Sequence, residues 1–344
     1  MKLLDSRKLG DFAAALVSAG YRVIAPVAEG GVVRLAQWKK GMPIRTDAIP
    51  VNSVKDALLP ASEVIGRYAF QGNDFALKDA RPDAPKTVVL CARPCDAASL
   101  AAMDTVFNWD YKDEFYNARR DATTVVTLAC ASCDDQCFCT SVGGAPDSTA
   151  GADAILRPAE DAQTLIFEPL SEKGRALADL GSGARGALGG VLVEGQALPR
   201  PPADVPVRFD PRLVADWCRE NFDSPLWVDL SLACLGCGAC AYACPTCHCF
   251  DIQDESTRRE GVRLRNWDSC GLALFTLHSS GHNPRSQQAA RWRQRVMHKF
   301  SYFPERFRLI ACTGCGRCGR LCPAGVAISE VCQRIERACK AGTK

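Results

Sequence analysis

The 344-residue sequence lacks the features that would assign it to a membrane or a nucleic acid. No uninterrupted apolar run approaches the roughly 20 residues of a membrane-spanning helix. The apolar stretch near the N-terminus is interrupted by Asp5, Arg7, Lys8 and Asp11. It therefore lacks the form of a signal peptide and is predicted to be an amphipathic helix. The formal net charge of +3 is too small to indicate nucleic-acid binding. We expect a cytoplasmic chain with no membrane and no nucleic-acid partner.

The sequence also lacks the familiar arrangements of catalytic residues. It contains no HExxH, no recognisable arrangement of Ser, His and Asp, and no paired carboxylates in a recognisable setting. A match to GxGxxG at residues 181–186 follows a helix-like segment, whereas a nucleotide-binding loop follows a strand and opens a helix. No flavin or nicotinamide site is visible, so any electrons that the chain handles must come from and go to other chains.

Cysteine, by contrast, is abundant, with 20 residues. This number is too high for a reduced cytoplasmic protein without metal, and in a secreted protein it would indicate a disulfide framework. Two runs, CLGCGACAYACP and CTGCGRCGRLCP, share the spacing CxxCxxCxxxCP. Bacterial ferredoxins hold two 4Fe–4S clusters with this spacing, and the fourth cysteine of each run ligates the other cluster. We therefore predict a first cluster on Cys234, Cys237, Cys240 and Cys322, and a second cluster on Cys312, Cys315, Cys318 and Cys244.

Small residues within the two runs permit the tight curl that brings three thiolates to one cluster. Gly236, Gly238 and Ala239 have this role in the first run, and Gly314 and Gly316 in the second. The alternative is zinc, because CxxC pairs also form tetrahedral thiolate sites. A zinc-stabilised scaffold gains nothing from repeating the full eight-cysteine pattern, and the colour of the purified protein distinguishes the two.

The pattern of apolar residues predicts an α/β domain over residues 1–207 and a mainly α-helical, two-cluster ferredoxin-like domain with a long insertion over residues 208–344. Residues 86–91 and 122–130 are predicted to be buried strands, and residues 94–107 a helix. Strand, helix and strand form a βαβ unit with parallel strands. Because ligands bind outside the carboxyl ends of parallel strands, the cysteines that follow both strands are expected to meet at one edge.

The six cysteines at this edge suggest a third iron–sulfur cluster. We favour Cys95, Cys130, Cys137 and Cys139 as its ligands, with Cys91 left in the buried strand and Cys133 as a spare. Asp96, Asp134 and Asp135 disfavour a thiolate beside them unless a metal compensates. The alternatives are buried thiols, a redox disulfide or zinc.

The insertion between the runs, residues 246–311, contains Cys247, Cys249 and Cys270. These thiols are candidates for a further metal site, although no ligand spacing is recognisable; otherwise they pack against the clusters. The stretch from Arg285 to Arg320 is rich in basic residues, with only Glu305 opposing them. We interpret it as a solvated helix face that offsets the negative charge of the clusters, or alternatively as a docking site for an acidic partner or a nucleotide phosphate.

An ordered series of motifs resembles one known family. The series comprises ARPCD, CASCDDQCFC, CLGCGACAYACPTCHCFD, WDSC, GHNPR, RQRVMHK and CTGCGRCGRLCP, from about residue 85 to the end. It resembles the iron–sulfur protein that serves as the beta subunit of soluble NAD(P)-linked nickel–iron sulfhydrogenases and has a counterpart in anaerobic sulfite reductase. The resemblance implies a relay between a flavoprotein that handles NAD(P)H and a catalytic subunit, either a nickel–iron hydrogenase or a sirohaem reductase. The extra Cys133 departs from the family pattern.

The sequence thus predicts a non-catalytic electron-transfer subunit of an oxidoreductase complex. The alternative is a self-standing iron–sulfur reductase of a disulfide or a sulfur compound at the N-terminal cysteine-rich site. Whether the chain is itself an enzyme is left open between these two hypotheses.

Overall fold

The computed structural model describes residues 1–72, 74–182 and 190–342. The motif at residues 181–186 therefore lies largely outside the described residues. The strands are β1 (Lys2–Asp5), β2 (Arg22–Glu29), β3 (Val32–Gln37), β4 (Ser62–Gln71), β5 (Asp74–Asp79), β6 (Thr87–Ala92), β7 (Thr123–Leu128), β8 (Ala154–Pro158), β9 (Thr164–Pro169), β10 (Leu192–Glu194), β11 (Phe250–Ser256) and β12 (Glu260–Trp267). The helices are α1 (Leu9–Ser18), α2 (Lys55–Leu58), α3 (Pro94–Val106), α4 (Glu114–Ala122), α5 (Glu172–Ser182), α6 (Pro211–Glu220), α7 (Leu226–Ser231), α8 (Ala239–Tyr242), α9 (Gln288–Met297), α10 (Phe303–Phe307), α11 (Arg317–Arg320) and α12 (Ile328–Lys340). Short 3-10 turns η1 (Ser6–Lys8) and η2 (Cys139–Val142) and a π-helical turn η3 (His298–Tyr302) complete the elements.

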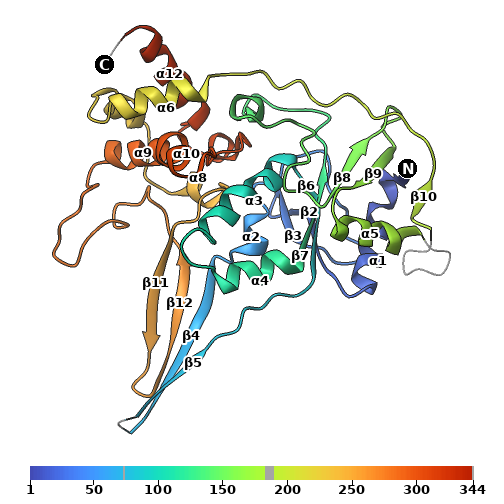
Figure 1. Ribbon diagram of the computed structural model, residues 1–344, viewed down its shortest axis with the longest axis horizontal. Coiled ribbons are helices and arrows are strands. Elements are labelled where there is room, and N and C mark those ends of the chain that lie inside the picture. The colour runs from blue at the N-terminus through green and yellow to red at the C-terminus, as the bar shows by residue number, and fades with distance from the viewer. Residues whose placement is uncertain (73, 183–189, 343–344) are drawn as a thin grey trace.

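An eight-stranded mixed sheet forms the centre of the N-terminal region, in the order β10-β1-β9-β8-β7-β6-β2-β3 (Figure 1). The strands β2, β6, β7 and β8 pair in parallel, and the outer strands pair antiparallel. Alternate residues of β6 face opposite sides: Val88 and Leu90 pack with α1 and α5, whereas Val89 packs with α2, α3 and α4. The predicted parallel βαβ unit is confirmed, because β6, α3 and β7 form it.

The N-terminal segment differs in part from its prediction. The amphipathic helix exists but begins only at Leu9. The preceding residues Lys2–Asp5 form a strand between β9 and β10. Leu4 of this strand is fully buried, so the short segment contributes to the core by pairing rather than by an amphipathic helical face.

A second core lies within the C-terminal helices. Trp217 of α6, Trp227 of α7, Val296 of α9 and Ile335 of α12 are buried together. Phe138, from the cysteine-rich N-terminal loop, joins the same core. None of the helices in the described part of the chain has the length and apolarity that crossing a bilayer requires.

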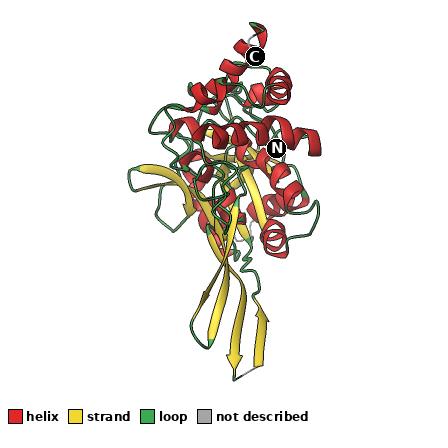
Figure 2. Ribbon diagram, turned by 90° about the vertical axis from the view of Figure 1, so that its left-hand side faces the viewer, coloured by secondary structure: helices red, strands yellow, loops and turns green. Residues whose placement is uncertain are grey.

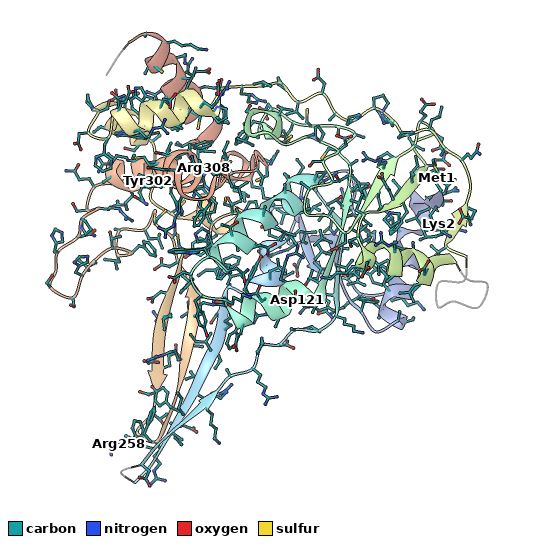
Figure 3. All side chains as sticks on the ribbon, in the orientation of Figure 1. Met1, Lys2, Asp121, Arg258, Tyr302 and Arg308 are labelled. Carbon is teal, nitrogen blue, oxygen red and sulfur yellow. The ribbon has the colours of Figure 1, made fainter. Side chains whose placement is uncertain are left out.

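A four-stranded antiparallel sheet projects from the body of the molecule, in the order β11-β12-β4-β5 (Figure 2). The hairpin of β11 and β12 belongs to the insertion between the cysteine runs, and β12 pairs with β4 from the N-terminal region. Arg258 marks the far end of this sheet (Figure 3). The C-terminal region is therefore only partly α-helical, which corrects the prediction: residues 250–267 form a hairpin, and its second strand, β12, pairs with the sequence-distant strand β4.

Candidate metal centres

The two cysteine runs share one local structure. In each run two glycines have left-handed φ values, 67° and 75° for Gly236 and Gly238, and 65° and 72° for Gly314 and Gly316. A single helical turn follows, α8 in the first run and α11 in the second. The curled backbone points an amide at a thiol, since the N–H of Gly236 donates to Cys234 Sγ over 3.4 Å. The tight curl that the sequence predicts is confirmed in both runs.

The fourth cysteine of the first run lies among the thiols of the second run. Burial raises the pKa of the Cys312 thiol to about 12; Lys299 opposes this shift, and the nearby Cys244 side chain adds to it. Cys244 also lies near Cys315 and Cys318. In the first run, Cys240 has Cys244, Cys234 and Cys237 as neighbours, so Cys244 lies near thiols of both runs. The position of Cys244 is compatible with the crossed pairing, and the ligand sets of both clusters remain a prediction.

The remaining predicted ligand of the first cluster is Cys322. Its Sγ accepts a hydrogen bond from the N–H of Val326 over 3.3 Å. The helical turns α8 and α11, which belong to the two runs, contact each other. Within the described residues, no three His, Cys, Asp or Glu side chains are arranged to hold a single metal ion. A 4Fe–4S cluster has four irons and takes four separate thiolates, so its ligands need not converge on one point.

Three buried cations surround the thiols of Cys244 and Cys247. Lys299 Nζ donates to Cys244 Sγ over 3.3 Å, and Arg295 Nη1 donates to Cys247 Sγ over 3.5 Å. Lys55 Nζ lies 3.8 Å from the ring centroid of Trp267 and is an electrostatic neighbour of the same two thiols. These three side chains are 3–5% exposed. No carboxylate within the described residues forms an ion pair with any of them.

The residues present fit an anionic cluster. A buried cation is costly unless it is paired, yet the partners available here are sulfur atoms and neutral oxygens. The Nε atom of Arg295 and the hydroxyl of Thr313 are also buried and have no hydrogen-bond partner in the part of the chain that the structure describes. A thiolate-ligated iron–sulfur cluster is anionic. It would accept hydrogen bonds from these unused donors and would neutralise the positive charge beside the thiols.

Cys244 is the more acidic thiol of the pair that it forms with Cys247. A hydrogen bond from Cys247 lowers the pKa of Cys244 well below its usual value, and Lys299 and Arg295 lower it further, although burial acts in the opposite direction. The pKa of Cys247 is raised by the same hydrogen bond and by burial. Because a thiolate is the form that binds metal, this asymmetry favours Cys244 over Cys247 as the ligand.

The N-terminal cysteines do meet at the carboxyl edge of the parallel strands. A small cavity is lined by Cys95, Cys130, Cys133, Cys137 and Cys139. Cys91 stays inside β6, where burial raises the pKa of its thiol to about 12. Cys133 is exposed, and its thiol donates to the carbonyl of Asp204 over 3.2 Å. The juxtaposition supports a third thiolate site, and its ligand set remains a prediction.

The second cysteine run packs directly against this N-terminal site, a relationship that the sequence did not reveal. The N–H of Phe138 donates to the carbonyl of Gly314 over 3.0 Å. A Cβ on Gly314 would lie 2.5 Å from the backbone of Cys139, and one on Gly316 would lie 2.4 Å from the carbonyl oxygen of Gln136. Cys315 also lines the N-terminal cavity. In the sequence, the two glycines were the signal that could have indicated this contact. Their presence was already accounted for by the tight curl of the cysteine run.

The aspartates beside the N-terminal thiols have arginine partners. Arg317, from the second run, forms a buried ion pair with Asp96, and Arg320 pairs with Asp134. Partial burial opposes the effect, but Arg320 lowers the pKa of Asp134 to about 2. The expectation that these aspartates disfavour thiolates was therefore incomplete, since nearby arginines neutralise two of them. With their charge neutralised by Arg317 and Arg320, Asp96 and Asp134 do not by themselves require a metal beside the thiols.

The basic stretch is also less solvated than predicted. Arg291, Arg295, Lys299 and Arg317 are buried rather than exposed on a helix face. The offset of cluster charge, which the same interpretation included, is supported by the contacts of Lys299 and Arg295 with thiols.

The remaining thiols lie at the base of the projecting sheet. Cys249 precedes β11 and Cys270 follows β12, and the N–H of Asp268 donates to the carbonyl of Cys249 over 3.0 Å. A hydrogen bond from Cys270 lowers the pKa of Cys249 to about 6, against the effect of burial. Cys247 contacts Cys244, as described above. These contacts add no third converging ligand within the described residues, so a separate metal site on these cysteines stays a hypothesis.

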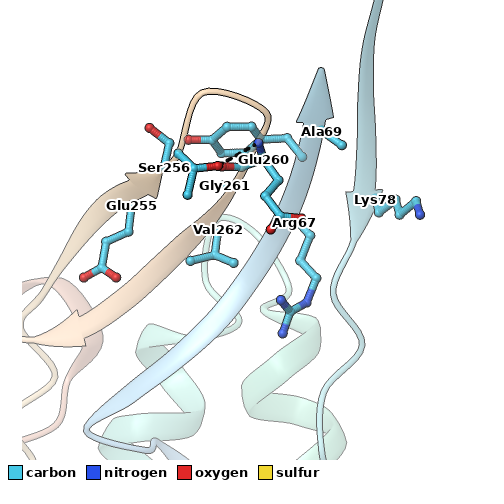
Figure 4. A pocket seen from close by; sticks show the side chains of 10 residues that line it. Arg67, Ala69, Lys78, Glu255, Ser256, Glu260, Gly261 and Val262 are labelled. Carbon is cyan, nitrogen blue, oxygen red and sulfur yellow. Dashed lines mark hydrogen bonds between the residues drawn. The ribbon is translucent and has the colours of Figure 1, made fainter. Parts of the chain in front are cut away.

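A larger cavity lies on the projecting sheet, away from the cysteines (Figure 4). Arg67, Lys78, Glu255 and Val262 are among its lining residues. It contains no thiol, so the chemistry suggested by the sequence belongs elsewhere in the molecule.

Comparisons with known proteins agree with this geometry. Residues 233–326 match the model of a family described as a 4Fe–4S dicluster domain. The chain is 28% identical over 267 residues to the sulfhydrogenase 2 subunit beta of Pyrococcus furiosus, which covers 73% of this chain and 74% of that protein. No solved structure matches. These matches confirm the resemblance seen in the motifs and support an iron–sulfur subunit of a hydrogenase-type family.

Proposed function

We propose that the chain is a non-catalytic, cytoplasmic electron-transfer subunit. It relays electrons between a flavoprotein that oxidises NAD(P)H and a catalytic subunit, either a nickel–iron hydrogenase or a sirohaem reductase. The domain match and the likeness to a sulfhydrogenase beta subunit support an iron–sulfur electron-transfer subunit. The identity of both partners is inferred from the resemblance of the motifs.

The proposal depends chiefly on one observation: two similarly built cysteine runs meet around buried cations that form no ion pair with a carboxylate among the described residues. Cys234, Cys237, Cys240 and Cys322 would hold one cluster, and Cys312, Cys315, Cys318 and Cys244 the other. A bound 4Fe–4S cluster supplies one-electron chemistry at a potential set by its charge, its hydrogen bonds and its exposure. The protein residues supply amide donors, positive charge and exclusion of water.

The N-terminal thiols would hold a third cluster, with Cys95, Cys130, Cys137 and Cys139 as ligands. Their cavity adjoins Cys315 of the second run, so the third site would continue the path of the other two. The same cavity supports the alternative function, a reductase of a disulfide or a sulfur compound, because the fifth thiol, Cys133, is exposed beside it.

Anaerobic redox titration followed by EPR tests the proposal. We expect two cluster signals that dithionite reduces at neutral pH, in protein that contains iron and acid-labile sulfide. Clusters that stay oxidised in excess dithionite would exclude a role beside NAD(P)H, and colourless protein containing zinc would exclude the whole proposal. A change in the EPR spectrum of the isolated chain on addition of a disulfide or a sulfur compound would favour the alternative.

A further inference from the structure

Lys299 occupies an unusual position on its helix. It lies in the π-helical turn η3, four residues after Arg295, so the two cations share one face of the helix. Nζ donates to Cys244 Sγ over 3.3 Å, to Thr246 Oγ1 over 2.9 Å and to the carbonyl of Ala311 over 2.8 Å. These contacts use all three protons of the ammonium group, which is therefore fixed in place.

The contacts of Lys299 join the two halves of the second cluster's predicted ligand set. Cys244 is the ligand contributed by the first run, and Ala311 immediately precedes Cys312, the first ligand of the second run. Among the thiols near Lys299 are Cys244, Cys247 and Cys312, and Cys249 of the insertion is a further electrostatic neighbour. Arg295 differs, because it lies near Cys240 of the first set as well as Cys244 and Cys318 of the second. Lys299 is therefore expected to act mainly on the second cluster, whereas Arg295 lies near predicted ligands of both clusters.

Lys299 also differs from the arginines of the second run in its charge balance. Arg317 is paired with Asp96, and Arg320 with Asp134. Lys299 has no carboxylate partner in the described part of the chain, and its oxygen contacts are neutral. An uncompensated cation in a buried site favours any added negative charge nearby, and reduction of a cluster adds one negative charge.

We propose that Lys299 raises the reduction potential of the second cluster relative to that of the first. This effect favours transfer of electrons toward the second run, which packs against the N-terminal cysteine site. This inference rests on the proposed function, because it requires that both clusters be present.

The test is a redox titration of K299M, monitored by EPR on the signal that is lost in C312S. We expect the midpoint potential of that signal to fall by at least about 59 mV, which is a tenfold change in the equilibrium constant for a one-electron couple. The signal lost in C234S should keep its potential. K299R retains the charge and should retain the native potential, and K340M, which removes a cation exposed on α12, is the matched control.

Iron and sulfide counts on each variant separate the two proposals. If the native chain holds no clusters, the proposed function fails. If K299M keeps its iron and its second-cluster potential is unchanged, or if K299R shifts the potential as far as K299M does, the inference about Lys299 is overturned. K299Q, which keeps a donor for the carbonyl of Ala311, carries the same expectation as K299M and replaces it if the methionine variant does not assemble.

Discussion

Arg317 and Asp96 form a fully buried ion pair across 221 residues of sequence. Arg317 Nη1 lies 2.6 Å from Asp96 Oδ1, and Nη2 lies 3.0 Å from Oδ2. The same carboxylate accepts the backbone N–H of Arg93 at the start of α3. The pair thus joins the second cysteine run to the helix of the βαβ unit, and it lies beside both Cys95 and Cys315.

Replacing Asp96 by Asn should destabilise the protein severely. The change leaves the Arg317 guanidinium buried without its counter-charge, which costs about 3–5 kcal/mol. The measurement is the thermal unfolding midpoint of anaerobic protein. D254N is the control, because Asp254 forms a similar two-pronged pair with Arg263 that is exposed. Exposed pairs contribute only about 0–1 kcal/mol, so equal effects of D96N and D254N would contradict the structural role of the buried pair.

The third site predicts the iron content of two variants. If Cys137 is a ligand, C137S should lose about four of about twelve irons per chain, since each 4Fe–4S cluster contributes four. C133S should keep its full iron content, because Cys133 is the spare thiol. Anaerobic iron and acid-labile sulfide assays measure both. About eight irons in the native protein would remove the N-terminal cluster, and loss of iron in C133S alone would reassign its ligands.

The crossed pairing predicts which variants share an EPR defect. C322S should lose the same signal as C234S, although Cys322 belongs to the other run. C244S should instead lose the signal that is lost in C312S. Low-temperature EPR of the four dithionite-reduced variants measures this. If C244S and C234S lost one common signal, each run would hold its own cluster and the pairing would be wrong.

Two glycines with similar backbone conformation should respond differently to alanine. Gly314 and Gly325 have φ values of 65° and 68°. In that region a side chain costs about 1–2 kcal/mol at either position. A Cβ on Gly314 would also collide with Cys139, whereas nothing lies within 4 Å of one on Gly325. We expect G314A, and not G325A, to lose iron at the N-terminal site. Equal iron contents would show that the two segments do not pack as described.

Low pH should reduce the free energy of unfolding, because two buried histidines near the cations are held in the neutral form. Burial lowers the pKa of His248 to about 4 and of His298 to about 3, with Lys299 acting in the same direction. Because the unfolded chain takes up protons more readily, this stability is complete above the unfolded pKa of about 6.5 and falls as pH decreases, by at most about 1.4 kcal/mol per pH unit for each histidine. Thermal midpoints between pH 7 and 5.5 measure the slope. The double variant H248Q/H298Q should flatten it, and an unchanged slope would assign the acid sensitivity to other groups.

The sequence alone predicted the parts of the fold that depend on local pattern. The apolar runs around β6 and β7 have the composition of buried strands, and the connection between them has the spacing of a helix. These local patterns were enough to predict the βαβ unit. The hairpin of β11 and β12 was missed. All seven residues of β11 are exposed, so no alternation of buried and exposed positions marked the strand. Its presence depends on pairing between β12 and β4, whose residues are about 200 positions apart in the sequence.

The sequence by itself determined the chemistry of this protein, because ligand type and spacing are local properties: eight cysteines in two CxxCxxCxxxCP runs predict thiolate-bound iron wherever the runs lie. Only the tertiary structure decided how that chemistry is embedded. It placed Gly314 against Cys139, paired Arg317 with Asp96, and placed Lys299 beside Cys244 with no carboxylate partner among the described residues. The energy of a charge depends on the counter-charges and solvent around it, and these come from segments far apart in the chain.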